Sequence, residues 1–194
     1  MSNKEHLHIH QPFYTIGHST RTINEFIKLL NASNVSMIVD VRTMPYSRTN
    51  PQYNKETIES ILKTHNIKYI HIPSLGGKRN KQKNILKSIN ALWENQSFHN
   101  YADYAMSETF REGLESLCEL GKIERCCIMC AEVVWWKCHR RLITDYLLLH
   151  GYDVYHILSL ISVKKATCTP GAKKMQNDVI TYPSDNKTLD FAVK

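Results

Sequence analysis

The chain lacks any run of about 18 apolar residues, the length that a helix needs to cross a bilayer. Its first residues, MSNKEHLHIHQP, contain no apolar stretch after their charged start, so they do not have the pattern of a secretory signal. Internal repeats and low-complexity linkers are also missing. These absences argue against membrane-spanning, secreted and repeat architectures. We therefore expect a cytoplasmic protein without a membrane partner.

The composition favours anionic partners. Hydrophobic residues make up 42% of the 194 residues and charged residues 22%, which is ordinary for a globular protein. The net charge is +7, which favours binding of nucleic acid or anionic small molecules. The densest basic run lies at 78–83 and is interpreted either as a solvated loop or as a binding surface. In a reducing compartment, the six cysteines are expected to be buried, reactive or metal-bound rather than disulfide-bonded.

Apolar runs predict five strands, at residues 13–17, 35–39, 67–72, 126–131 and 153–158. Segments with helical periodicity separate them. Thr22 and Glu25 have the spacing of a capping box, and Asn54 is placed to cap a second helix. A basic helix with apolar positions over 85–93, a helix over about 101–120 and a helix over about 138–150 complete the pattern.

This alternation predicts an α/β fold. We expect a mostly parallel five-stranded sheet with right-handed crossovers and helices on both faces, in a Rossmann-like three-layer arrangement. After Ser162 the chain becomes more polar, and turn residues at 169–171 and 176–178 predict a small C-terminal hairpin.

Polar residues gather where the predicted strands end. In an open parallel sheet, ligands bind beyond the carboxyl ends of the strands, near a switch in strand order. The first strand is followed by His18, Ser19 and Arg21, and the second ends in Asp40 and Arg42. The third leads to a turn at 76–77, and the fourth ends at 130–132. We expect these side chains to line one pocket, although Asp40 and Arg42 also suit a purely structural ion pair.

The stretch CAEVVWWKCHRR, residues 130–141, is the strongest candidate for chemistry. Side chains alternate along a strand, so Cys127 and Cys130 face opposite sides and cannot form a metal knuckle. Cys138 stands at the start of a predicted basic helix, where the helix dipole and the arginines favour its thiolate and also suit a phosphate group.

Three interpretations of the cysteines stay open at this point. Cys138 acts as a nucleophile, with His139 or Glu132 as its base or orienting group. Alternatively, Cys130, Cys138 and His139 bind a metal with a fourth ligand from elsewhere, such as His18. In the third interpretation both cysteines are inert, buried hydrophobic residues.

Four separated motifs together resemble the DUF488 family, a widespread group of bacterial and archaeal domains. They are YTIGHS at 14–19, DVRxxPxS at 40–47, LGG at 75–77, and CAE at 130–132 with CHR at 138–140. The similarity extends from about residue 13 to 183. We therefore expect one domain over 13–183, a flexible segment over 1–12 and a tail over 184–194.

The resemblance implies an α/β fold and a shared polar site, but it does not supply a reaction. By position, the motif residues are His18, Ser19, Asp40, Arg42, Ser47, Gly76, Gly77, Cys130, Glu132, Cys138, His139 and Arg140. Similar members often have a histidine just before the Thr-Pro step, where this chain has Ala166-Thr167-Cys168. This departure weakens the metal interpretation.

The preferred hypothesis is an enzyme that acts on a phosphate-bearing or nucleic-acid-derived substrate. Its catalytic residues would be Cys138, Cys130, Glu132, His139 and Asp40, with no metal ligand assigned and no cofactor identified. The substrate would contact His18, Ser19, Arg21, Arg42, Ser47, Gly76, Gly77, Arg140 and Arg141. The alternatives are a non-catalytic nucleic-acid-binding protein, using 78–87, Arg141 and the tryptophans, and the Cys/His metal site. The oligomeric state stays open.

Overall fold

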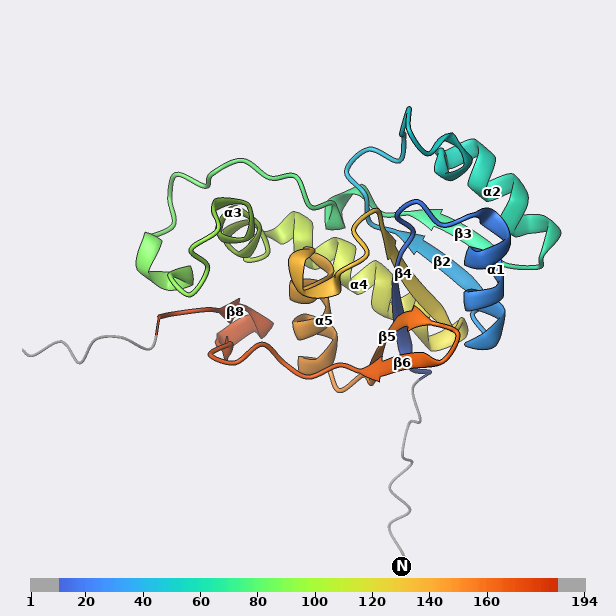
Figure 1. The fold of residues 1–194 in the computed structure, drawn as a ribbon. Helices are drawn as coiled ribbons and strands as arrows, with labels where there is room; N and C mark the ends of the chain where they lie inside the picture. Colours follow the sequence, from blue (N-terminus) through green and yellow to red (C-terminus); the bar gives the residue numbers. More distant parts are fainter. Residues whose placement is uncertain (1–10, 185–194) are drawn as a thin grey trace, which may run out of the picture.

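The computed structural model describes residues 11–184, and most of the expected N-terminal segment and C-terminal tail lie outside them. The main sheet has six strands, in the spatial order β3-β2-β4-β1-β5-β6 (Figure 1). They are β1 (Phe13–Gly17), β2 (Met37–Asp40), β3 (Lys68–His71), β4 (Cys126–Cys130), β5 (Val154–Ser159) and β6 (Ser162–Lys165). The first five are mutually parallel, which confirms the predicted α/β fold with a sheet one strand larger than expected.

The additional strand, β6, pairs antiparallel with β5 at one edge of the sheet. Its sequence, SVKK, is exposed at all four positions, so it carries no hydrophobic alternation to mark it as a strand. Its strand conformation depends on backbone pairing with β5. Lysines on an edge strand also discourage pairing with other chains.

Helices cover both faces of the sheet, as the three-layer prediction requires (Figure 1). They are α1 (Ile23–Ala32), α2 (Lys55–Thr64), α3 (Gln96–Tyr104), α4 (Glu108–Ile123) and α5 (Arg140–Leu149). Apolar side chains of α1 and α2 pack with one face of β4, and those of α3, α4 and α5 pack with the other. The side chains of β4 alternate as expected, because Cys126, Ile128 and Cys130 belong to one core cluster and Cys127 and Met129 to the other.

The region between β3 and α4 differs from the prediction. The expected basic helix over 85–93 is an irregular segment with one short 3-10 helix, η3 (Lys87–Asn90), and the expected helix over 101–120 is divided into α3 and α4. The side-chain amide of Asn90 is buried and donates to Asp103 at 2.8 Å. Asn95 and Ser107 cap the two helices. Buried polar contacts and caps therefore override the apolar periodicity of this region.

Local signals at other element ends agree with the structure. Thr22 and Glu25 form the predicted capping box of α1, and Gly151 ends the turn after α5 with a φ of +81°. The C-terminal hairpin is present as β7 (Lys173–Lys174) and β8 (Ile180–Thr181). Tyr182, just after β8, donates its hydroxyl to Asp145 of α5 at 2.9 Å and so fixes the hairpin to the domain core. Within residues 11–184, no helix is long and apolar enough to span a membrane.

The strand order places a crevice at the carboxyl end of β4. The chain leaves β1 and β2 toward α1 and α2 on one face, whereas it leaves β4 toward α5 on the other face. Because β4 lies between β1 and β2, neighbouring loops diverge at this point. This is the switch in strand order at which ligands bind in open α/β sheets.

Candidate functional site

A pocket of about 590 Å³ opens at this crevice. The lining combines residues from the loops after β1, β2, β3 and β4 with one residue of α3. They are His18, Ser19, Thr20, Arg42, Thr43, Met44, Tyr46, Ser47, Asn50, Gly77, Lys78, Ser97, Cys130, Ala131 and His139. A neighbouring hollow of about 200 Å³ shares Gly77, Ser97, Cys130 and His139, and it adds Cys138 and Glu132. Residues far apart in sequence therefore meet at one rim of the sheet.

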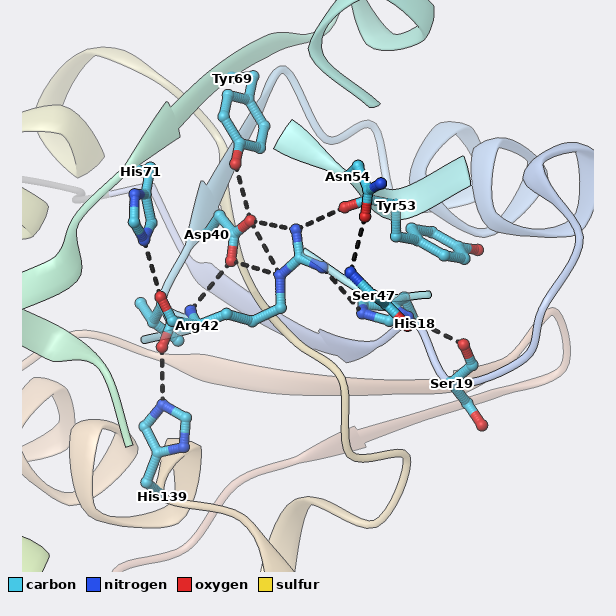
Figure 2. A network of polar contacts seen from close by, with 11 residues as sticks. His18, Ser19, Asp40, Arg42, Ser47, Tyr53, Asn54, Tyr69, His71 and His139 are labelled. Atoms are coloured by element: carbon cyan, nitrogen blue, oxygen red, sulfur yellow. Dashed lines mark hydrogen bonds and ion pairs between the residues drawn. The ribbon is translucent and has the colours of Figure 1, made fainter. Parts of the chain in front are cut away.

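Asp40 and Arg42 form a buried ion pair (Figure 2). The Arg42 Nε donates to both carboxylate oxygens, at 2.9 and 3.0 Å, and Nη2 donates to Oδ2 at 2.5 Å. Tyr69 donates its hydroxyl to the same carboxylate at 2.7 Å. Asp40 is fully buried and does not line the pocket, so its role in this geometry is to hold the guanidinium.

Arg42 also contacts two residues other than Asp40. Nη2 also donates to the carbonyl of Tyr53 at 2.7 Å, and Nη1 contacts His18 Nε2 at 3.2 Å. A guanidinium has five N–H donors. These contacts use four of them, and the second hydrogen on Nη1 has no acceptor among the described residues. Arg42 also lines the pocket, although only 6% of it is exposed.

His18 is held as a neutral imidazole. Its Nδ1 donates to the carbonyl of Ser19 at 2.9 Å, and its Nε2 accepts from Arg42 (Figure 2). The ring stacks on Tyr53 with centroids 4.1 Å apart. Burial, followed by the charge of Arg42, lowers the pKa of His18 to about 4. At neutral pH the ring therefore adds no positive charge to the pocket.

The loop after β2 forms one wall of the pocket. Ser47 donates its backbone N–H to Asn54 Oδ1 at 2.7 Å, and its hydroxyl accepts from the backbone N–H of Asn50 at 3.0 Å. Asn54 precedes α2 as predicted, but its side chain makes no capping bond because it binds this loop instead. Met44 and Tyr46 on the same loop are 72% and 58% exposed, so apolar surface borders the pocket mouth.

Cys130, Cys138 and His139 meet at the opposite wall. The Nδ1 of His139 lies 3.5 Å from the sulfur of Cys138 and 4.0 Å from that of Cys130, and the three atoms lie within 4.8 Å of one another. On the far side of the ring, Nε2 donates to the carbonyl of Val41 at 3.0 Å. This bond keeps the proton on Nε2, so Nδ1 is free to accept a proton from a thiol.

The two thiols have opposite acidities. The hydrogen bond to Cys138, together with burial, raises the pKa of Cys130 well above the usual value of a thiol. Burial alone would also raise the pKa of Cys138, but the hydrogen bond from Cys130, His139 and the charge of Arg140 together hold it well below the usual value. The pair is therefore best described as a Cys138 thiolate that accepts a hydrogen bond from the Cys130 thiol.

Arg140 is a buried partner of this thiolate. The residue is 1% exposed, and its Nε donates to Cys138 Sγ at 3.3 Å. Nη2 donates to the carbonyls of Glu132 and Val133 in the loop after β4. Arg140 therefore acts on the sulfur, and it lines neither the pocket nor the smaller hollow.

The other residues expected at the site occupy varied positions. Ser19 lines the pocket, and its backbone is in the left-handed region with a φ of 47°. Arg21 donates to the carbonyls of Gly17 and Leu158 beside the strands, and Arg141 donates to Thr169 at 2.9 Å and lies over Trp93. Neither arginine lines the pocket.

The two glycines and Glu132 follow the third and fourth strands. A Cβ on Gly77 would overlap the ring of His139, and one on Gly76 would lie 2.8 Å from the hydroxyl of Thr43. Glu132 is exposed at the smaller hollow, and its carboxylate accepts from the backbone of Val134 at 3.0 Å. The glycines therefore allow close packing at the rim, and only Gly77 contacts the reactive wall.

The cysteine wall also has the composition of a metal site. Cys130, Cys138 and His139 supply three ligand atoms close enough to share one ion. The suggested fourth ligand, His18, is bonded through both ring nitrogens to Ser19 and Arg42. A guanidinium already contacts the Cys138 sulfur, and this positive charge opposes a cation at the same position. The arrangement therefore suits a thiolate better than a metal.

Several residues of the site are additional to the motif residues. Tyr53 and Tyr69 complete the Arg42 network, and Thr43, Lys78 and Ser97 line the pocket. Ser97 comes from α3, which does not directly follow a strand of the sheet. Of these residues, only Lys78 belongs to a feature that the sequence marks out, the basic run at 78–83.

Comparisons with known proteins agree with the motifs. A family model described as "Domain of unknown function DUF488" matches residues 22–147, more than half of the chain. Searches of curated proteins and of solved structures found no match. The matched segment includes β2, β3, β4 and most of α5, and with them Asp40, Arg42, Cys130, Cys138 and His139. On the strength of this family match, the chain belongs to the DUF488 family.

Proposed function

We propose that this protein is a cysteine-dependent enzyme whose nucleophile is the Cys138 thiolate. The observation that carries the proposal is the setting of this one sulfur atom, which is contacted by a thiol, an imidazole and a guanidinium at the edge of an open pocket. A structural cysteine needs none of these partners, whereas an activated one needs a base or a positive charge beside it. The proposed enzyme would act in the cytoplasm, where thiols stay reduced.

In this function the sulfur attacks an electrophilic atom of the substrate, and the leaving group departs with the bonding electrons. His139 is the proton carrier, because its Nδ1 faces the sulfur and its ring is oriented by the Val41 carbonyl. It holds the proton of Cys138 as an imidazolium and returns it to the leaving group. Glu132 is exposed at the smaller hollow, and its carboxylate accepts a hydrogen bond from the backbone of Val134 in the loop before Cys138.

The pocket suits a substrate that carries a phosphate or another anionic group. The hydroxyl-bearing residues Ser19, Thr20 and Thr43 line it together with Arg42. Lys78 is exposed at the margin and adds a mobile positive charge. Charge-assisted hydrogen bonds from arginine are typical of phosphate recognition. Burial keeps His18 neutral, so it contributes packing and Arg42 contributes the charge.

Thiol labelling with protection tests the proposal. Iodoacetamide should alkylate Cys138 faster in the folded protein than in urea, and peptide mapping should place the label at this residue. Inorganic phosphate or a nucleoside monophosphate should slow the reaction. Labelling that is as slow as in the denatured chain would contradict an activated Cys138, and full-rate labelling with millimolar ligand present would contradict the anionic substrate.

A second candidate function, binding of a nucleic-acid strand, is favoured by the basic segment at the pocket margin. Lys78, Lys81 and Lys83 are exposed on the irregular chain that follows Gly77. Several phosphate contacts make affinity fall by orders of magnitude between low and physiological salt. Fluorescence anisotropy with a labelled oligonucleotide should show this dependence, and replacing the three lysines by glutamine should reduce it. An affinity that does not change with salt would exclude this candidate.

A further inference from the structure

We propose that Cys130 is a second catalytic thiol, and that the Cys130–Cys138 pair carries out thiol–disulfide exchange with a small anionic disulfide in the strand-end pocket. This inference rests on the proposed function, because Cys138 must first be nucleophilic. It adds the class of reaction and assigns a role to Cys130 that a single nucleophile would not require.

The placement of the two sulfurs supports the proposal. Cys130 is the last residue of β4, and Cys138 directly precedes His139 at the start of α5, so the loop over 131–137 returns the chain to the same point. Both are free thiols, and their sulfurs lie within 4.8 Å of each other. Side-chain rotation within this distance brings two sulfurs to bonding range. The pair is therefore positioned to close a disulfide without a large backbone movement.

Access to the pocket distinguishes this pair from the remaining cysteines. Cys130 lines both the large pocket and the smaller hollow, and Cys138 lines the smaller one. Cys126 and Cys127 are completely buried in β4. Burial raises the pKa of Cys118 and Cys168 to about 11, and neither lines the strand-end pocket. A disulfide bound in the pocket would meet only Cys130 and Cys138.

The chemistry balances in two steps. The Cys138 thiolate attacks one sulfur of R–S–S–R, the S–S bond breaks, and a first RS⁻ leaves and takes the proton that Nδ1 of His139 received from Cys138, which empties Nδ1. Cys130 then loses its proton to Nδ1 of His139 and attacks the Cys138 sulfur, which expels a second RS⁻ that receives this proton. The protein dithiol is oxidised by two electrons, and the substrate disulfide is reduced to two thiols. Exchange with a reducing thiol restores the starting state.

The experiment uses 5,5′-dithiobis(2-nitrobenzoate), an anionic aromatic disulfide whose released thiolate absorbs visible light. The protein carries Cys118→Ser and Cys168→Ser so that thiols outside the pocket do not react, and it is compared with the same protein that also carries Cys130→Ser. With Cys130 present we expect two equivalents of released thiolate, no retained adduct and a Cys130–Cys138 crosslink in the peptide map. With Cys130→Ser we expect one equivalent and a stable nitrobenzoate adduct on Cys138.

The outcomes separate the two proposals. A stable adduct on Cys138 in both proteins would overturn the role of Cys130 and leave the nucleophile intact. No release from either folded protein would overturn the nucleophile and the exchange together. The crosslink is read in the protein that retains Cys130, so the result does not depend on folding of the Cys130→Ser variant. Elemental analysis of the reduced protein identifies any bound metal, and a full equivalent per chain would overturn the exchange.

Discussion

Replacing Arg140 with lysine should shift the reactivity of Cys138 to higher pH. The guanidinium Nε donates to the Cys138 sulfur at 3.3 Å, and lysine lacks the planar fork that reaches both this sulfur and the loop carbonyls. A hydrogen bond to a charged group contributes about 1.5–3 kcal/mol. Its loss disfavours the thiolate by a factor of about 10 to 150, because about 1.4 kcal/mol corresponds to a tenfold change.

The measured rate changes by less than the thiolate population. A more basic thiolate is a better nucleophile, with a Brønsted coefficient of about 0.4–0.5. Below the pKa of the thiol, the alkylation rate of Arg140→Lys should therefore be about four- to fifteenfold lower than that of the unmodified protein. At high pH, where both proteins hold the thiolate, the variant should react at an equal or higher rate. The two pH profiles should cross.

The assay is the rate of iodoacetamide alkylation of Cys138 from about pH 5 to 10, read by peptide mass. Lys137→Gln is the control, because it removes a positive charge from the exposed end of the same loop and leaves the Arg140 bond to the sulfur in place. Its profile should stay close to that of the unmodified protein. Identical profiles for Arg140→Lys and the unmodified protein would refute the reasoning, as would an equal shift in the Lys137→Gln control.

Three further predictions concern stability and packing. Asp40→Asn leaves the Arg42 guanidinium without its buried counter-ion and should lower the free energy of unfolding in urea by about 3–5 kcal/mol; a loss below about 1 kcal/mol would contradict this. Burial lowers the pKa of His156 to about 4, so as pH falls from about 6.5 the unfolded chain takes up the proton before the folded one does. Up to about 3 kcal/mol of the free energy of unfolding is therefore lost by pH 4. In urea titrations, His156→Gln should flatten this pH profile, whereas the exposed control His65→Gln should not. Gly77→Ala places a methyl group on the His139 ring and should slow Cys138 alkylation at neutral pH, which an unchanged rate would contradict.

Most of the fold followed from the sequence because each buried strand is a short apolar run. The run at 13–17 coincides with β1, and the run at 126–131 extends one residue beyond β4. The expected basic helix failed for a physical reason, since the amide of Asn90 is buried against Asp103 and the chain there follows polar contacts instead of a helical stripe. β6 was missed because it is exposed at every position.

The sequence predicted which strand ends form the candidate site, but it did not predict the role of each residue there. The parallel order of β1, β2 and β4 brings His18, Arg42 and Cys130 to one rim, as the motif positions suggested. The direction of each arginine could not be read from the sequence, because Arg140 and Arg141 are adjacent and yet one reaches the Cys138 sulfur and the other Thr169. Such differences depend on the helical turn of α5, which separates neighbouring side chains by about 100°.

The short stretch at the end of β2 couples both walls of the pocket. The side chain of Arg42 meets His18, the carbonyl of Val41 receives His139, and the carbonyl of Arg42 receives His71 (Figure 2). A displacement of this stretch by a bound ligand would therefore move the Arg42 guanidinium and the His139 imidazole together. A ligand bound beside Arg42 would then change the position of His139 and, with it, the reactivity of Cys138.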